Sequence, residues 1–181
     1  MIICGLIFGL LVLAYPLLPG MAQKGQGQKN PEQEKALQVV RQNVIANIFY
    51  DTLQAQESDW TLTKADYFGG GEAITERGIE RDPYSVNLVL KKDESEAQVL
   101  IYEYASEDDA KLRPKTLVSA GRYEECKGVE CGDEGEKIYG QYSKGLSWEF
   151  RKGRFFVSIY ADSEETAKRF AGYALTAITG K

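Results

Sequence analysis

Cys126 and Cys131 are the residues with the best-defined chemistry, and they lie in the segment CKGVEC. In an oxidising compartment such a pair predicts a disulfide, and closing so short a loop would stabilise the fold by roughly 2 kcal/mol. A metal site and a redox site are the alternatives. Two thiolates without histidine would need carboxylates to complete a tetrahedral metal site, and redox catalysis favours a shorter spacing. We therefore expect a structural disulfide and no metal.

Six acidic residues lie between Glu124 and Glu136, around these cysteines. Their spacing lacks the alternating ligands and the closing glutamate of an EF-hand, so a solvated acidic loop is favoured over a calcium site. Glu103 is a second candidate carboxyl, on the strand face predicted for Val99 and Ile101. It would serve as a general acid if that face were buried. We expect instead that it reaches water at the end of its strand.

A glycine-rich segment, made up of Tyr67, Phe68, Gly69, Gly70 and Gly71, places two aromatic side chains beside a bendable backbone. Neither the Gly-Lys-Ser/Thr ending of a phosphate-binding loop nor a GxGxxG spacing is present. A mobile loop is the simpler interpretation. The alternative is a binding loop, because loops often carry functional residues.

Three cations, Arg151, Lys152 and Arg154, surround the turn of a predicted hairpin. Such a cationic tip is a candidate contact for anionic lipid or for an acidic carbohydrate. Cationic tips are more often simply solvated, and that is the expectation here.

The chain of 181 residues contains no histidine and has a net charge of −5. The missing histidine excludes Ser-His-Asp and Cys-His catalysis and all histidine-ligated metals. The mildly acidic balance argues against nucleic acid, which requires a basic surplus. We predict no catalytic residues and no cofactor, and we favour a function other than catalysis.

The N-terminal residues 1–22 contain no charged side chain and include an apolar run from Ile2 to Leu13, broken by Pro16 and Pro19. The pattern predicts a signal peptide or an uncleaved membrane anchor. Residues 23–29 are polar and glycine-rich, as in a flexible tether. Residues 30–181 are then a single domain that is periplasmic, extracellular or tethered to the outer face of the membrane.

Two long helices are predicted from capping residues and apolar spacing. Asn30 and Pro31 begin one that continues to about Gln56, and the segment Asp162-Ser163-Glu164-Glu165 begins another that ends before Gly180. The apolar stripe expected on the first helix consists of Leu37, Val40, Val44, Ile45, Ile48, Phe49 and Leu53. The stripe expected on the second consists of Ala167, Phe170, Ala171, Ala174, Leu175 and Ile178. A shorter helix is expected after Ser106, with Pro114 interrupting it.

Alternating residues predict the strands. Val86–Leu90 and Gln98–Tyr104 form one hairpin around the charged turn KKDESE, and 137–142 is a further strand. Leu146–Ala161 predicts a second hairpin with a Lys152-Gly153 turn, so that Phe150 faces Phe155 and Trp148 faces Val157. Together these elements predict an α+β fold, a mainly antiparallel sheet of about five strands with helices on one face.

Roughly the last 80 residues contain VLIYEYASEDDAKL and GEKIYGQYSKGLSWEFRKGRFFVSIYADSEETAKRFAGYA. This pattern resembles a loose group of exported, uncharacterised bacterial α+β domains, with a strand that ends in Ser/Asp-x-x-x-Ala, a Lys-Gly-Arg hairpin and a final Ala-rich helix. The resemblance implies a fold and an exported location, and it implies no activity.

The leading functional hypothesis is an exported, non-catalytic binding or accessory module that binds a protein, an envelope component or a small ligand. The alternative is a carboxylate-dependent hydrolase acting on envelope polymers or sugars. Membrane contact would come from the N-terminal segment.

Overall fold

The computed structural model describes residues 30–75, 78–112, 122–139 and 145–180. The strands of the main sheet are β1 (Thr61–Phe68), β4 (Tyr84–Lys92), β5 (Ser95–Glu103), β6 (Arg122–Glu125), β7 (Glu134–Tyr139), β8 (Leu146–Lys152) and β9 (Phe155–Ala161). They form one antiparallel sheet of seven strands in the order β1-β4-β5-β9-β8-β7-β6. The shorter strands β2 (Glu72–Thr75) and β3 (Gly78–Arg81) pair separately as a hairpin.

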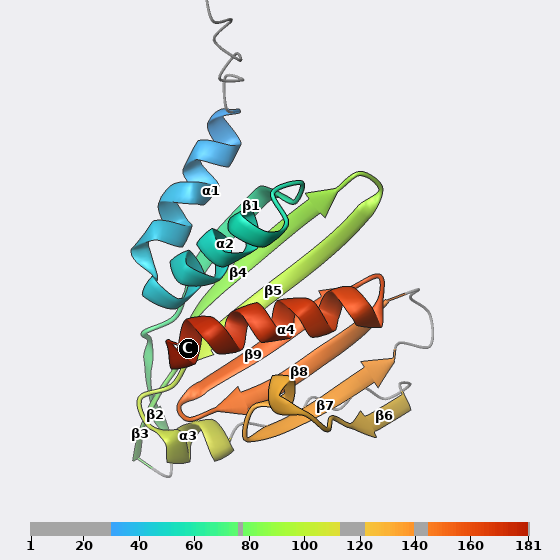
Figure 1. The fold of residues 1–181 in the computed structure, drawn as a ribbon. Coiled ribbons are helices and arrows are strands. Elements are labelled where there is room, and N and C mark those ends of the chain that lie inside the picture. Colours follow the sequence, from blue (N-terminus) through green and yellow to red (C-terminus); the bar gives the residue numbers. More distant parts are fainter. Residues whose placement is uncertain (1–29, 76–77, 113–121, 140–144, 181) are drawn as a thin grey trace, which may run out of the picture.

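The helices are α1 (Pro31–Gln42), α2 (Val44–Gln56), α3 (Glu107–Leu112) and α4 (Glu164–Thr179), with a 3-10 turn η1 (Val129–Cys131). Figure 1 shows α2 and α4 lying across one face of the main sheet, with α1 beside β1 and with α3, β2 and β3 at one end. The predicted α+β class is confirmed, although the sheet has more strands than the five expected. The predicted signal or anchor (1–22) and tether (23–29) lie outside the described residues.

The single helix predicted up to Gln56 is wrong, because Asn43 divides it in two. Its backbone is extended (φ −112°, ψ 118°), and its Oδ1 accepts a hydrogen bond of 2.9 Å from the Ala46 amide. Asn43 therefore caps α2 as Asn30 caps α1. The break also rotates the predicted stripe, so that Val44 is 70% exposed and Ile48 is 37% exposed.

The hydrophobic core lies between α2, α4 and the sheet. Phe170 of α4 is fully buried and meets the rings of Phe49, at a centroid distance of 5.9 Å, and Trp60, at 5.1 Å. The predicted start and end of α4 are confirmed. The Ser163 hydroxyl caps the helix by accepting from the Thr166 amide, and Gly180 follows in the left-handed conformation.

A polar network ties the end of α2 to α4. The Glu57 carboxylate accepts from Arg169 Nε at 2.9 Å, from the Tyr173 hydroxyl at 2.9 Å and from Trp60 Nε1 at 3.2 Å. Burial raises the pKa of Glu57, but the hydrogen bonds and the charge of Arg169 outweigh it, so this pKa lies below its usual value. The ionised carboxylate therefore holds the two helices together.

Both long hairpins form, but the predicted register of β8 and β9 is wrong by two residues. Phe150 faces Val157 and Trp148 faces Ile159, because the loop is Gly153-Arg154 and not Lys152-Gly153. A shift of two keeps every apolar side chain on the same face, so the hydrophobic pattern does not distinguish the registers. The Asp133 carboxylate, which lies outside the hairpin in sequence, accepts from the Gly153 amide at 2.8 Å. This hydrogen bond favours the observed turn over the predicted one.

The remaining differences concern the ends of strands. The mobile-loop interpretation is wrong for Tyr67 and Phe68, because both belong to β1, which pairs with β4 as far as Phe68. The chain turns between β4 and β5 after Lys92 and resumes pairing at Ser95, so KKDESE is mostly strand. β7 begins before the predicted 137, β6 was not foreseen, and 140–144 lie outside the described residues.

Candidate functional site

Exposed aromatic side chains gather where β1 ends and β4 begins, and we call Tyr67, Phe68 and Tyr84 the aromatic end. Their exposed fractions are 44%, 57% and 48%, and no other aromatic side chain that the structure describes is comparably exposed. The rings of Tyr67 and Tyr84 stack with centroids 6.1 Å apart and planes at 21°. Antiparallel pairing of β1 with β4 brings these residues together, because Phe68 faces Ser85 across the strands.

The glycines that follow β1 allow the chain to pass closely over the start of β4. Gly69 and Gly70 have φ angles of +111° and +80°, where side chains are disfavoured. A Cβ atom on Gly69 would overlap the Pro83 carbonyl, and one on Gly70 would lie 2.5 Å from the ring of Tyr84. The glycines thus have a packing role that does not depend on any ligand.

A pocket of about 220 Å³ opens beside the aromatic end. Its lining residues come from the glycine segment, the start of β4, the end of β5 and the β8–β9 turn, and they are Gly70, Asp82, Tyr84, Glu103, Tyr104, Ala105 and Arg154. Three separate sequence candidates therefore meet here: the glycine segment, Glu103 and one cation of the predicted tip.

Arg154 and Glu103 form the polar wall of this pocket. The guanidinium lies 2.6 Å from the Glu103 carboxylate, and both side chains are part exposed, at 50% and 28%. The guanidinium also lies over the Phe155 ring, 5.5 Å from its centroid, in the geometry of a cation–π contact. The Arg154 carbonyl accepts from the Tyr104 amide at 3.0 Å. These contacts fix the charged group at the mouth of the pocket.

The charge of the pocket is mixed but predominantly negative, since Asp82 and Glu103 outnumber Arg154. The Tyr67 side chain lies close to this negative charge. Burial raises the pKa of Tyr67 above its usual value, and the Tyr84 hydroxyl and the Glu103 carboxylate add to the effect. Tyr67 is protonated at neutral pH, as an unperturbed tyrosine also is, and both donates and accepts hydrogen bonds.

The other two cations of the predicted tip lie in different surroundings from Arg154. The Arg151 side chain is only 8% exposed and points to the face of the sheet opposite Phe150, where it contacts Asp133 at 3.3 Å and Glu107 at 3.5 Å. Lys152 pairs with Asp133 at 2.7 Å. The three cations therefore do not form one surface.

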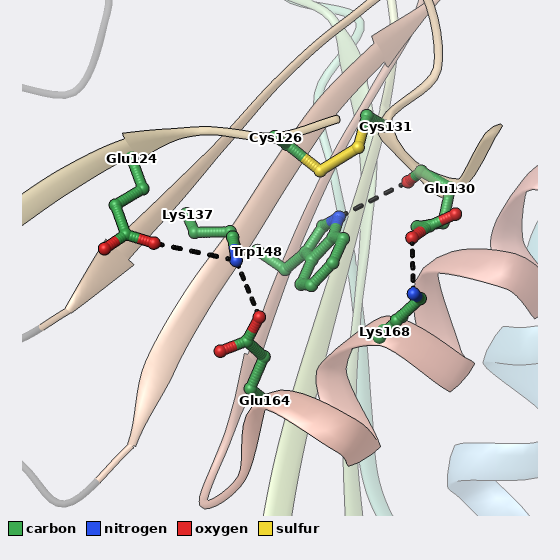
Figure 2. Close-up of a disulfide and its surroundings, with 8 residues drawn as sticks. All are labelled: Glu124, Cys126, Glu130, Cys131, Lys137, Trp148, Glu164 and Lys168. Atoms are coloured by element: carbon green, nitrogen blue, oxygen red, sulfur yellow. Dashed lines mark hydrogen bonds and ion pairs between the residues drawn. A yellow bond between two sulfur atoms is a disulfide. The ribbon is translucent and has the colours of Figure 1, made fainter. Parts of the chain in front are cut away.

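The cysteine loop packs against the sheet and α4 (Figure 2). The Sγ atoms of Cys126 and Cys131 are 2.02 Å apart, at disulfide distance. Beside them the buried Trp148 donates from Nε1 to the Glu130 carbonyl at 3.3 Å, and the Glu130 carboxylate pairs with Lys168 of α4 at 2.9 Å. Both contacts hold the loop through Glu130.

An acidic pocket of about 480 Å³ lies next to the cysteine loop, and its charged lining residues are Glu124, Glu125, Asp133, Glu134 and Glu136. Burial raises the pKa of Asp133, but Lys152, the Gly153 amide and Arg151 outweigh it and lower this pKa. No group of three or more acidic or cysteine ligands suited to a metal ion occurs among the described residues.

The sequence did not single out Asp82 or Tyr84, which complete the pocket around Glu103 and Arg154. Asp82 belongs to the charged segment after the glycines, and its amide donates to the Gly71 carbonyl at 2.9 Å. The sequence signal was Pro83, which ends the charged segment, and β4 begins at the next residue, Tyr84. Only the pairing of β1 with β4 brings this position next to the end of β1 and the glycines that follow it.

Comparisons with protein families, with curated proteins and with solved structures find no match to this chain. Within residues 30–180, as far as they are described, no helix has the length and apolar character needed to cross a membrane.

Proposed function

We propose that this chain is an exported, non-catalytic binding module whose binding surface is the aromatic end together with the adjacent pocket. The observation that carries the proposal is that every well-exposed aromatic side chain that the structure describes lies at one end of the sheet. Aromatic rings left in water at one place are typical of a contact surface, because they supply much apolar area with little conformational freedom to lose.

Two observations support the location. The cysteines lie at disulfide distance, and such bonds persist in oxidising compartments. The uncharged N-terminal segment fits export or tethering at the membrane. A binding module in that compartment would meet envelope polymers and envelope proteins before any cytoplasmic ligand.

The hydrolase alternative has one observation in its favour, because Asp82 and Glu103 line the same pocket. Glycoside hydrolysis needs one carboxyl group to protonate the leaving oxygen and another to act as base or nucleophile. Glu103, however, pairs with the Arg154 guanidinium at 2.6 Å, so that oxygen is already occupied by a cation. This arrangement supports binding more than proton transfer.

The test is capture of envelope material by the full chain, immobilised at its C-terminus. The paired variant Tyr67→Ala/Tyr84→Ala removes the stacked rings, and Val129→Ser is the control, since Val129 is 89% exposed on a different part of the surface. We expect the paired variant to lose capture and the control to keep it. Equal capture by all three proteins would contradict the proposal.

Two further measurements on the same material test location and catalysis. The intact mass of the recovered chain after thiol alkylation should show Cys126 and Cys131 unmodified, as expected for a disulfide. Release of reducing ends from envelope glycans should be absent. Release that is lost in Glu103→Gln would replace the binding module by the hydrolase.

A further inference from the structure

The pocket at the aromatic end combines hydrogen-bond donors with acceptors at close range. Arg154 supplies only donors, the Asp82 and Glu103 carboxylates supply only acceptors, and the Tyr84 phenol supplies both. A ligand that satisfies this set must itself carry donors and acceptors side by side. Hydroxyl groups meet that requirement, because each one donates and accepts.

Ligands of a single charge fit the pocket less well. An anion would pair with Arg154 but would lie against two carboxylates, and like charges in contact are destabilising. A cation would suit the carboxylates, but Arg154 already occupies Glu103 at 2.6 Å and would repel a second cation. The mixed charges therefore favour a neutral ligand rich in hydroxyl groups.

The stacked rings add a requirement of shape. Tyr67 and Tyr84 are nearly parallel, at 21°, and each keeps almost half of its surface exposed. The face of an aromatic ring is negative and attracts the slightly positive hydrogens of C–H bonds. A pyranose ring presents such C–H bonds on one flat side and hydroxyl groups around its rim, so it matches both the rings and the pocket.

The size of the pocket limits how much of the ligand enters it. Its volume is about 220 Å³. Pockets that hold drug-sized ligands usually begin at about 300 Å³, so this one is smaller. One sugar ring is of the right scale, with the neighbouring units of a longer chain lying over the aromatic end. We infer that the pocket and the Tyr67–Tyr84 stack bind one saccharide unit of a neutral glycan. This inference rests on the proposed function and names its ligand class.

The experiment titrates the full chain, labelled with ¹⁵N, with neutral oligosaccharides of glucose and of N-acetylglucosamine. Sulfated dextran and a lysine-rich peptide serve as anionic and cationic probes. A neutral oligosaccharide should shift the amide signals of Gly70 and Ala105. Glu103→Gln and Arg154→Gln should each raise its Kd about tenfold, since each loses a charged hydrogen bond, whereas Val129→Ser should leave the Kd unchanged. Thermal melting of each variant checks that it is folded.

Failure of this inference is distinct from failure of the proposed function. If envelope capture depends on Tyr67 and Tyr84 but no neutral oligosaccharide shifts the Gly70 and Ala105 signals, the binding module stands and the saccharide is wrong. If only the peptide or only sulfated dextran shifts them, the ligand is charged and the inference is overturned. If oligosaccharide binding persists unchanged in Tyr67→Leu, which keeps an apolar side chain, the stacking argument is wrong.

Discussion

Replacing Glu57 by glutamine should destabilise the fold by about 2 kcal/mol at neutral pH, because hydrogen bonds to a charged acceptor contribute about twice as much as neutral ones. The carboxylate accepts from Arg169, Tyr173 and Trp60. A glutamine has nearly the same shape, but its side-chain oxygen carries no charge. Its NH₂ group would also face one of the donors. The Arg169 side chain is 38% exposed. Its ion pair therefore adds less than a buried pair would.

The effect has a defined dependence on pH. Burial acts to raise the pKa of Glu57, but the hydrogen bonds from Arg169 and Tyr173 outweigh it, so this pKa is lowered in the folded state. The stabilisation is therefore complete above the unfolded-state pKa of about 4.3 and is lost as the pH falls through the lower folded-state pKa. Wild type and Glu57→Gln should differ at neutral pH and converge in acid.

Urea denaturation followed by tryptophan fluorescence measures the free energy of unfolding at each pH. Glu165→Gln is the matched control, because Glu165 contacts the same Arg169 at 2.9 Å but is 85% exposed. That change should cost less than about 0.5 kcal/mol. Equal effects of the two substitutions, or a Glu57→Gln effect that is unchanged in acid, would refute the reasoning.

Four further changes test the core and the backbone. Replacing Cys126 and Cys131 by serine should lower the free energy of unfolding by about 2 kcal/mol in urea titrations, since the loop they close is short. Phe170→Ala should cost about 3–5 kcal/mol in the same assay, because the ring is fully buried. Gly70→Ala should lower the melting temperature, because its φ is +80° and the new Cβ would meet a ring at 2.5 Å. Gly172 has nothing within 4 Å of an added Cβ. Gly172→Ala should therefore raise the melting temperature by stabilising α4 by about 0.5–1 kcal/mol.

The outcomes that would contradict these predictions are equally specific. Equal unfolding free energies of the wild type and the serine variant under oxidising conditions would show that the cysteine pair contributes nothing. A Phe170→Ala cost below about 1 kcal/mol would mean that the site collapses around the missing ring. Gly70→Ala and Gly172→Ala having the same sign would contradict the contrast between a strained turn and an open helix surface.

The sequence was most informative at helix ends, because a capping residue acts on backbone groups that are close to it in sequence. Asn30, Ser163 and Gly180 mark helix ends because their side chains or backbone satisfy the free groups at a terminus. The same rule, applied to Asn43, would have divided the first helix, but the apolar spacing on both sides concealed the break. Local capping chemistry and periodicity disagreed there, and capping prevailed.

Strand alternation determined the faces of β8 and β9 but left their register open. Moving the partner strand by two residues preserves every inward side chain, so only the turn distinguishes the alternatives. Asp133, which binds the Gly153 amide, is distant in sequence from that turn. Its contribution depends on the pairing of β7 with β8 and is invisible to any local pattern.

The candidate site shows the same division. From the sequence alone came the residue types: an aromatic pair next to glycines, a carboxyl between tyrosines, a cluster of cations and a pair of cysteines. Whether they meet was decided by the sheet order, which places the end of β1, the start of β4, the end of β5 and the β8–β9 turn at one end. The chemistry of a side chain is a local property, whereas proximity between distant segments arises only when strands pair. For this reason Arg154 lies at the pocket, while Arg151 is buried on the face of the sheet opposite Phe150.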